Sequence, residues 1–333
     1  MSSKIKAVSI GGGCGAVQVL AGLSKYLDDL TGIVAVTDTG RSTGKVRNLA
    51  NIPAPGDIRN AIATLATNEL FVAQLMQHRL DVPSYEPLNG VAFGNLMLAA
   101  MTQMTGNFGQ AVALLQNMAG VKATILPVTI HSTHICAELM DGRVVEEELH
   151  VRALGKPEIK RVFIKDVDAH VYEPCTDALR EANLITIGPG SLFTTVIACL
   201  AFKGIANAIG QSKAKVVYVC NNTTQPGQTD GYTLFDHVKQ ITRYLGAGRL
   251  DYVLLNSRAP SAHAARLFAA DGVHVLLPTD EEVTRIESLG VKALVSNLAE
   301  LSDTKRDLWQ KQDSIRHDPD AVAKVLMELM HSA

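Results

Sequence analysis

A glycine-rich segment near the N-terminus has the residue types and spacing that suit a phosphate group. Its residues are Gly11, Gly12, Gly13, Cys14 and Gly15. An apolar run from Ala7 to Ile10 precedes the segment and predicts a buried strand, and the apolar spacing from Val17 to Leu27 predicts a helix. Backbone N–H groups reach a phosphate where no Cβ intervenes, and a helix N-terminus adds about half a positive charge. We therefore expect an anion-binding loop here, with a simple tight turn as the alternative.

A second small-residue loop repeats this arrangement later in the chain. The apolar run from Leu184 to Ile187 predicts a buried strand, and Gly188, Gly190 and Ser191 follow it before a helix. We expect Ser191 to be the N-cap of that helix and to contact phosphate. A serine nucleophile is disfavoured because the G-x-S-x-G pattern is absent.

Polar side chains follow other predicted strands. Asp38 comes after the apolar run Gly32–Thr37, and Asn221 opens a loop rich in amides and hydroxyls after Lys215–Cys220. Open α/β sheets bind ligands at the carboxyl ends of their strands, so both residues are candidates for the site. Asp38 can accept a sugar hydroxyl or hold a divalent cation such as magnesium, and a flexible polar loop is the alternative. Asn95 is an amide that opens an otherwise apolar helix, where burial demands hydrogen-bond partners.

The order of these elements predicts an α/β fold with a mostly parallel sheet, because strand, helix and strand open the chain. We expect a single domain, 1–333, with a small antiparallel insert around residues 123–168. Its predicted strands are Ile125–Ile130, Ile135–Met140 and Val144–Val151, with Glu146, Glu147 and Glu148 as a solvated strand edge rather than a metal site. Asp57, after two prolines, is predicted to cap the next helix. An insert of this kind can carry contacts to partners or to further copies, so a homo-oligomer stays an open alternative.

The amino-acid composition limits the classes to which the protein can belong. The 333 residues are 47% hydrophobic and 19% charged, which is typical of a compact chain with a sizeable core. A net charge of −2 argues against a nucleic-acid partner, because such footprints are basic. The five cysteines are scattered without C-x-x-C spacing, which fits a reducing compartment. No apolar run reaches membrane-spanning length and no secretory leader is visible, so we expect no membrane contact and a cytoplasmic location.

Seven segments taken in order resemble the gluconeogenesis factor family (YvcK-like proteins), which is related to the 2-phospho-L-lactate transferase (CofD) superfamily. They are GGGCGAVQVLAGL, VAVTDTGRSTGKVR, PAPGDIRNAIATLA, FGNLMLAAM, IGPGSLFTT, YVCNNTTQPGQTDGYTLFDHV and IRHDP. The resemblance spans almost the whole chain. It implies a Rossmann-like three-layer fold and a cytoplasmic protein that binds uridine-diphosphate sugars, notably UDP-N-acetylglucosamine. It also implies links to gluconeogenic growth, cell shape and an enzyme partner in cell-wall precursor synthesis.

Carried over by residue, the resemblance implies that the Gly11–Gly15 loop cradles the diphosphate. Asp38, Asn95, Asn221 and the Gly188–Ser191 loop would line the same crevice, and Arg316 would close on the nucleotide. Three positions depart from the usual family pattern, because Cys14 replaces Thr, Thr39 replaces Asp and Gln228 replaces Glu. Two carboxylates are therefore absent from places where a metal or an acid–base pair is expected.

These observations favour a nucleotide-sugar-binding regulatory protein that needs no cofactor. The main alternative is a nucleotide-dependent transferase of the 2-phospho-L-lactate type, with Asp38 as a magnesium ligand. An NAD-binding oxidoreductase follows from the fold alone and is the least favoured, because no acidic residue ends the second strand in the usual ribose-binding way.

Overall fold

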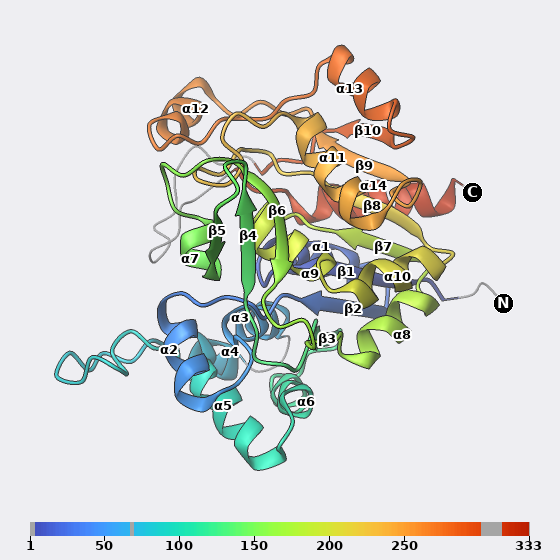
Figure 1. Ribbon diagram of the computed structural model, residues 1–333. Coiled ribbons are helices and arrows are strands. Elements are labelled where there is room, and N and C mark those ends of the chain that lie inside the picture. The colour runs from blue at the N-terminus through green and yellow to red at the C-terminus, as the bar shows by residue number, and fades with distance from the viewer. Residues whose placement is uncertain (1–3, 67–69, 301–314, 333) are drawn as a thin grey trace.

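Seven parallel strands form the central sheet of the protein, whose computed structural model describes residues 4–66, 70–300 and 315–332 (Figure 1). The strand order is β10-β9-β8-β7-β1-β2-β3. These strands are β1 (Lys6–Gly11), β2 (Asp29–Val34), β3 (Thr124–Pro127), β7 (Leu184–Ile187), β8 (Lys215–Val219), β9 (Tyr252–Asn256) and β10 (Lys292–Ser296). The central strand β7 is buried at every position, because helices cover both faces of a parallel sheet.

Helices enclose the sheet from both sides. In the first half they are α1 (Gly15–Leu23), α2 (Arg41–Ala50), α3 (Gly56–Leu65), α4 (Leu70–Gln77), α5 (Phe93–Thr105), α6 (Phe108–Met118) and α7 (Glu147–Val151). In the second half they are α8 (Glu173–Glu181), the π-helical turn η1 (Leu192–Val196), α9 (Ile197–Leu200), α10 (Lys203–Gln211), α11 (Leu234–Leu245), α12 (Ala262–Ala269), α13 (Asp280–Glu287) and α14 (Pro319–His331).

The direction of winding reverses between β1 and β7. From β1 the chain proceeds outward to β2 and β3, whereas from β7 it proceeds the opposite way to β8, β9 and β10. Because crossovers between parallel strands are right-handed, the helices that connect strands in the two halves lie on opposite faces. On one face α1 packs on α14, which follows the last strand, and on the other α10 packs on α8 and α11. The predicted α/β, Rossmann-like three-layer fold is confirmed.

A second, antiparallel sheet has the order β5-β4-β6 and lies on the side facing the viewer in Figure 1. Its strands are β4 (Ile135–Leu139), β5 (Val144–Glu146) and β6 (Ile159–Ile164). The antiparallel insert is thus present, but it is narrower than predicted: β3 pairs in parallel with β2 and belongs to the central sheet. The single-domain boundary 1–333 stays a prediction.

Two predicted strands have different bounds in the structure. The segment expected as Gly32–Thr37 is the strand β2, which begins at Asp29 and ends at Val34. The segment expected as the strand Val144–Val151 is a three-residue strand followed by the helix α7. Three successive glutamates at residues 146–148 end the strand early, because glutamate has a low strand propensity and is tolerated in the first turn of a helix.

Within the described part of the chain, no single helix has the length and apolar character needed to cross a bilayer. One bent pair, Leu192–Leu200 with Lys203–Gln211, meets those two criteria jointly, with an angle of 65° between its helices.

Close packing of α1 on α14 generates a stability prediction. A Cβ added to Gly22 would overlap the carbonyl oxygen of Pro319 and approach the Cβ of Ala323 to 3.1 Å. We expect Gly22→Ala to lower the free energy of unfolding by about 1–3 kcal/mol, because overpacking forces a backbone shift. Gly210→Ala, also in a helix but with no atom within 4 Å of the added Cβ, is the matched control. It should raise stability by about 0.5–1 kcal/mol. Urea unfolding measures both, and equal effects would contradict this account.

Candidate functional site

A cavity of about 470 Å³ lies at the reversal point of the sheet, next to the loops that leave β1 and β7. This is the position at which open α/β sheets bind ligands, and the volume falls in the range of small-molecule sites. The predicted site residues that line it are Gly12, Gly13, Cys14, Gly15, Asp38, Gly190, Ser191, Asn221 and Arg316. Gly11, Gly188 and Asn95 are not among the lining residues. Asn95 is fully buried in α5, and no described residue is a hydrogen-bond partner of its amide.

The two glycine loops need their glycines to pack together. A Cβ on Gly13 would overlap the backbone of Asp57, and a Cβ on Gly15 would overlap the carbonyl of Pro189. These glycines therefore bring the loop after β1 against both α3 and the loop after β7. The same absence of side chains leaves the loop backbone accessible to a ligand in the cavity.

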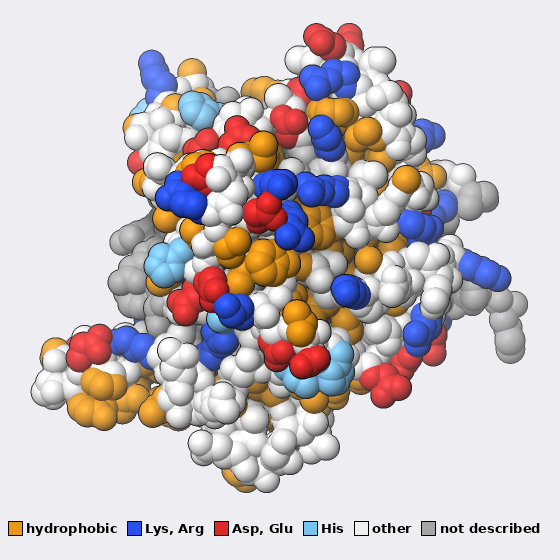
Figure 2. All heavy atoms as spheres, in the orientation of Figure 1, with side chains coloured by type: hydrophobic (Ala, Val, Ile, Leu, Met, Phe, Trp, Pro, Cys, Tyr) orange, Lys and Arg blue, Asp and Glu red, His pale blue; other side chains and the backbone are white. Residues whose placement is uncertain are grey.

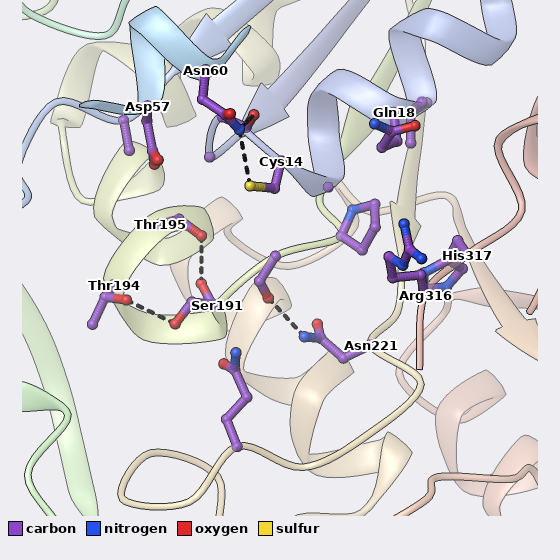
Figure 3. Close-up of a pocket in the computed structure, with 18 of the residues that line it drawn as sticks. Cys14, Gln18, Asp57, Asn60, Ser191, Thr194, Thr195, Asn221, Arg316 and His317 are labelled. Carbon is purple, nitrogen blue, oxygen red and sulfur yellow. Dashed lines mark hydrogen bonds between the residues drawn. The ribbon is translucent and has the colours of Figure 1, made fainter. Parts of the chain in front are cut away.

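Helix N-termini surround the cavity, and their first N–H groups have no partner within the helix. Cys14 precedes α1 and Ser191 precedes η1, and neither side chain caps its helix. The amide nitrogen of Asn60 in α3 donates to the carbonyl oxygen of Gly13 over 2.5 Å and lies 3.1 Å from the sulfur of Cys14 (Figure 3). The N-termini of α1 and η1 thus present a partial positive charge to the cavity.

Ser191 occupies the predicted N-cap position of η1, but its side chain accepts no N–H group of that helix. Its hydroxyl instead donates to Oε1 of Gln228 over 2.9 Å and lies 2.7 Å from the hydroxyl of Thr194. Asn221 donates to the carbonyl of Gly190 over 2.7 Å, which ties the loop after β8 to the loop after β7 (Figure 3).

Asp38 is joined at the cavity by a second carboxyl group, from Glu148 in α7. The pKa of Glu148 is raised well above its ordinary value, first by burial and then by the charge and the hydrogen bond of Asp38. Arg152 partly offsets this, since its Nη1 donates to Oε1 of Glu148 over 3.1 Å. The backbone N–H of Glu148 donates to the hydroxyl of Thr39 over 3.2 Å and fixes the start of α7. The raised pKa favours the protonated form of Glu148, whose carboxyl group faces the cavity beside Asp38.

Two predictions about acidic residues are corrected here. The run Glu146–Glu148 is a solvated strand edge only in part: Glu146 ends the edge strand β5 and is half-exposed, whereas the side chain of Glu148 is only 12% exposed and lines the cavity. Asp57 does not cap α3, since the N-cap position is Pro55. Its carboxyl group lies in the first turn of α3 and also lines the cavity.

The opposite side of the cavity is formed by the C-terminal segment that carries Arg316 and His317 (Figure 3). The N–H of Glu300 donates to the carbonyl of Arg316 over 2.9 Å, and a β-bridge joins Ala299 to His317. Nη2 of Arg316 lies 3.0 Å from Oε2 of Glu300. The guanidinium group is therefore held at the cavity by an ion pair that is about one-third exposed to solvent.

His317 is kept neutral at this place. Burial lowers its pKa to about 4, opposed by a hydrogen bond to the backbone of Cys220. Nε2 of His317 has no partner among the described residues, and neither does the buried Oδ1 of Asn222. Both residues line the cavity. The other ring nitrogen of His317 bonds to the backbone of Cys220, so Nε2 carries no proton and can only accept a hydrogen bond. At this end of the cavity, Nε2 of His317 and Oδ1 of Asn222 are therefore two acceptors that suit N–H or O–H groups.

Similarity to known proteins identifies the family of this chain. The family model of 2-phospho-L-lactate transferase CofD matches residues 7–299. The gluconeogenesis factor of Bacillus subtilis is 37% identical over 330 residues, with 99% of each chain covered. This chain belongs to the CofD family, in the branch of the gluconeogenesis factors. The gluconeogenesis factor of Listeria innocua is 34% identical and shares 98% of this chain and 96% of its own. A crystal structure of a UPF0052 family protein from Bacillus halodurans superposes with a TM-score of 0.89 at 33% identity, covering 97% and 99% of the two chains.

In this family member, sequence reasoning missed several residues at the site. Glu148 and Arg152 could have been found from their spacing of four, which places an acid and a base on one helix face. In the sequence, His317 stands only within the motif IRHDP, and Asn222 only within the polar loop that follows β8. Whether Nε2 of His317 and Oδ1 of Asn222 lack hydrogen-bond partners depends on tertiary contacts, so the sequence does not indicate it.

The buried imidazole of His317 generates a pH prediction. Its pKa of about 4 lies below the value of about 6.5 for an exposed histidine, so the unfolded chain binds the proton more readily. This contribution to stability is present above the unfolded pKa and is lost as the pH falls toward the folded pKa. Between about pH 7.5 and about pH 5 it should cost about 2 kcal/mol.

Urea unfolding at both pH values checks this prediction. His317→Gln should lose that part of the pH dependence. His331→Gln, at the exposed last residue of α14, should keep it. An unchanged pH dependence in His317→Gln would show that the imidazole is not the group responsible.

Proposed function

We propose that this family member is a regulatory protein that binds a nucleotide sugar of the UDP-N-acetylglucosamine type. The observation that carries the proposal is the order of groups along the cavity. In Figure 3, Cys14 and Ser191, which precede α1 and η1, lie between Asp57 on one side and Arg316 and His317 on the other. A nucleotide sugar has the same order of parts, since a diphosphate separates a nucleoside from a sugar.

The middle of the cavity suits the diphosphate. The N-terminus of α1 supplies N–H groups and partial positive charge, and Arg316 adds a positive charge from the opposite side. Charge-assisted hydrogen bonds of this kind are roughly twice as strong as neutral ones, so these groups supply most of the expected affinity.

The ends of the cavity suit the two polar parts of such a ligand. Nε2 of His317 and Oδ1 of Asn222 need donors, which sugar hydroxyls and the N–H groups of a base provide. A ligand donor here would remove the cost of two buried, unpaired acceptors, about 1–3 kcal/mol for each. This favours a hydroxyl-rich or N–H-bearing ligand over inorganic phosphate.

The other end suits a divalent cation. Asp38, Asp57 and Glu148 supply carboxyl oxygens, which magnesium prefers, so the donor set fits the ion although Thr39 replaces the expected Asp. Asp38 and Glu148 would hold the ion, which would offset the charge of the diphosphate. The proposal treats magnesium as an accessory to binding.

The proposal includes a cytoplasmic location and a role in gluconeogenic growth, cell shape and cell-wall precursor supply. An enzyme of precursor synthesis is the proposed partner, and a homo-oligomer stays an open alternative. Acidic and basic side chains are interspersed on the face shown in Figure 2, which supports a partner other than nucleic acid.

Calorimetric titration with UDP-N-acetylglucosamine tests the proposal. Arg316→Ala should weaken binding roughly ten- to hundredfold, because a charge-assisted phosphate contact is lost. Arg180→Ala, on the surface of α8 with its side chain 53% exposed, should leave the affinity unchanged. Absence of heat with any uridine nucleotide would remove the proposed ligand class. Unchanged binding by Arg316→Ala would remove the site assignment.

The second candidate is a nucleotide-dependent transferase of the 2-phospho-L-lactate type. The carboxyl cluster around Asp38 favours it, because Glu148 supplies a carboxyl group that the sequence lacks at Thr39. For a binding protein, we expect no release of nucleotide from an activated donor in the presence of magnesium. Magnesium-dependent turnover in the wild type that disappears in Asp38→Asn would replace our proposal with the transferase. Product release can be followed by chromatography.

A further inference from the structure

Away from the cavity, the antiparallel sheet brings together three side chains of types that bind metal ions. They are His134, Cys136 and Glu146, whose ligand atoms all lie within 4.8 Å of one another. We propose that they form a site for a borderline divalent cation of the zinc class. This site is separate from the carboxyl cluster at the cavity, and the proposal does not depend on the identity of the ligand bound there.

The strand register places the three side chains on one face of the sheet. Cys136 in β4 is paired directly with Glu146 in the antiparallel strand β5. His134 precedes Cys136 by two residues, and side chains at that spacing point to the same face of a strand. The N–H of Lys165 donates to the carbonyl of His134 over 2.9 Å and ties this residue to the end of β6. The backbone therefore holds all three positions without a metal ion.

The distances fit tetrahedral coordination. Nε2 of His134 lies 3.4 Å from Oε2 of Glu146. Two ligands of a tetrahedral zinc ion, with bonds of about 2.0–2.2 Å, lie roughly 3.3–3.5 Å apart. The sulfur of Cys136 needs to approach by at most about 1.2 Å to reach its own ideal separation. A small change of side-chain torsion completes the set.

The ligand types select the metal. One nitrogen, one sulfur and one carboxylate oxygen suit zinc and its analogue cobalt, whereas magnesium and calcium take oxygen ligands. Cys136 is buried, but His134 and Glu146 are partly exposed. The fourth position therefore faces solvent, as in zinc sites with three protein ligands and a water molecule.

Lys165 supports the carboxylate rather than occupying the site. Its Nζ lies 2.5 Å from Oε1 of Glu146, which leaves Oε2 directed toward His134. Ligating carboxylates are commonly hydrogen-bonded through their second oxygen in this way. With a thiolate and a carboxylate as ligands, the dication, the two anions and the Lys165 ammonium sum to one positive charge, so the ammonium group does not prevent binding.

The position of the site connects it to the cavity. Glu146 is the residue immediately before α7, and α7 presents Glu148 to the cavity, with Arg152 at its C-terminal end. An ion held by Glu146 would fix the residue at which this helix begins.

Cobalt substitution followed by absorption spectroscopy tests the proposal, with zinc affinity measured by competition against a chromophoric chelator. The wild type should bind one equivalent and show a thiolate-to-cobalt charge-transfer band. Cys136→Ala should lose the band, whereas Glu146→Gln and His134→Gln should bind at least about tenfold more weakly. Each variant is first shown to be folded by thermal melting without metal. Since Glu146 is half-exposed, its variant provides an arm that does not disturb the core.

Two control variants distinguish this site from other side chains that could bind a metal ion. Cys14→Ser removes an exposed thiol at the cavity, and His170→Gln removes one of two imidazoles whose Nε2 atoms lie 3.2 Å apart. Both should keep the wild-type band and affinity. Absence of stoichiometric binding, a band that persists in Cys136→Ala, or a band that disappears in either control would overturn the proposal.

Discussion

The close approach of two glycine loops at the reversal of the sheet is the constraint on which the site depends. Gly13 touches the backbone of Asp57, and Gly15 touches the backbone of Pro189. A side chain at either position would separate the loop after β1 from α3 or from the loop after β7. The helix N-termini would then diverge, and their N–H groups would no longer point into one cavity. Packing and ligand access therefore require the same glycines.

Charge is distributed unevenly around this backbone cradle. Asp38, Asp57 and Glu148 form an acidic end, where burial and the neighbouring Asp38 raise the pKa of Glu148. Arg316 is paired with Glu300 on the other side, so its charge is positioned before any ligand arrives. A preorganised site of this kind loses less conformational entropy on binding.

The C-terminal segment completes the cavity through contacts with distant parts of the chain. Asn222 donates to the carbonyl of Ile315, and the N–H of Asp318 donates to the carbonyl of Leu298 over 2.6 Å. These bonds connect the end of β8, the end of β10 and the start of α14. Helix α14 in turn packs on α1. The C-terminal segment that precedes α14 and the glycine loop that precedes α1 are therefore held together by one packed layer of helices.

The sequence by itself determined the parallel α/β architecture and the two glycine loops, because apolar runs and glycines act locally through burial and backbone freedom. It also indicated Asp38 and Asn221 as candidates for one site, to which the family resemblance added Arg316. Only the tertiary structure decided that β3 joins the central sheet, that Glu148 lies beside Asp38, and that Ser191 bonds to Gln228. Each of these depends on which distant groups meet in space, and that is fixed by packing across the sheet rather than by any spacing along the chain.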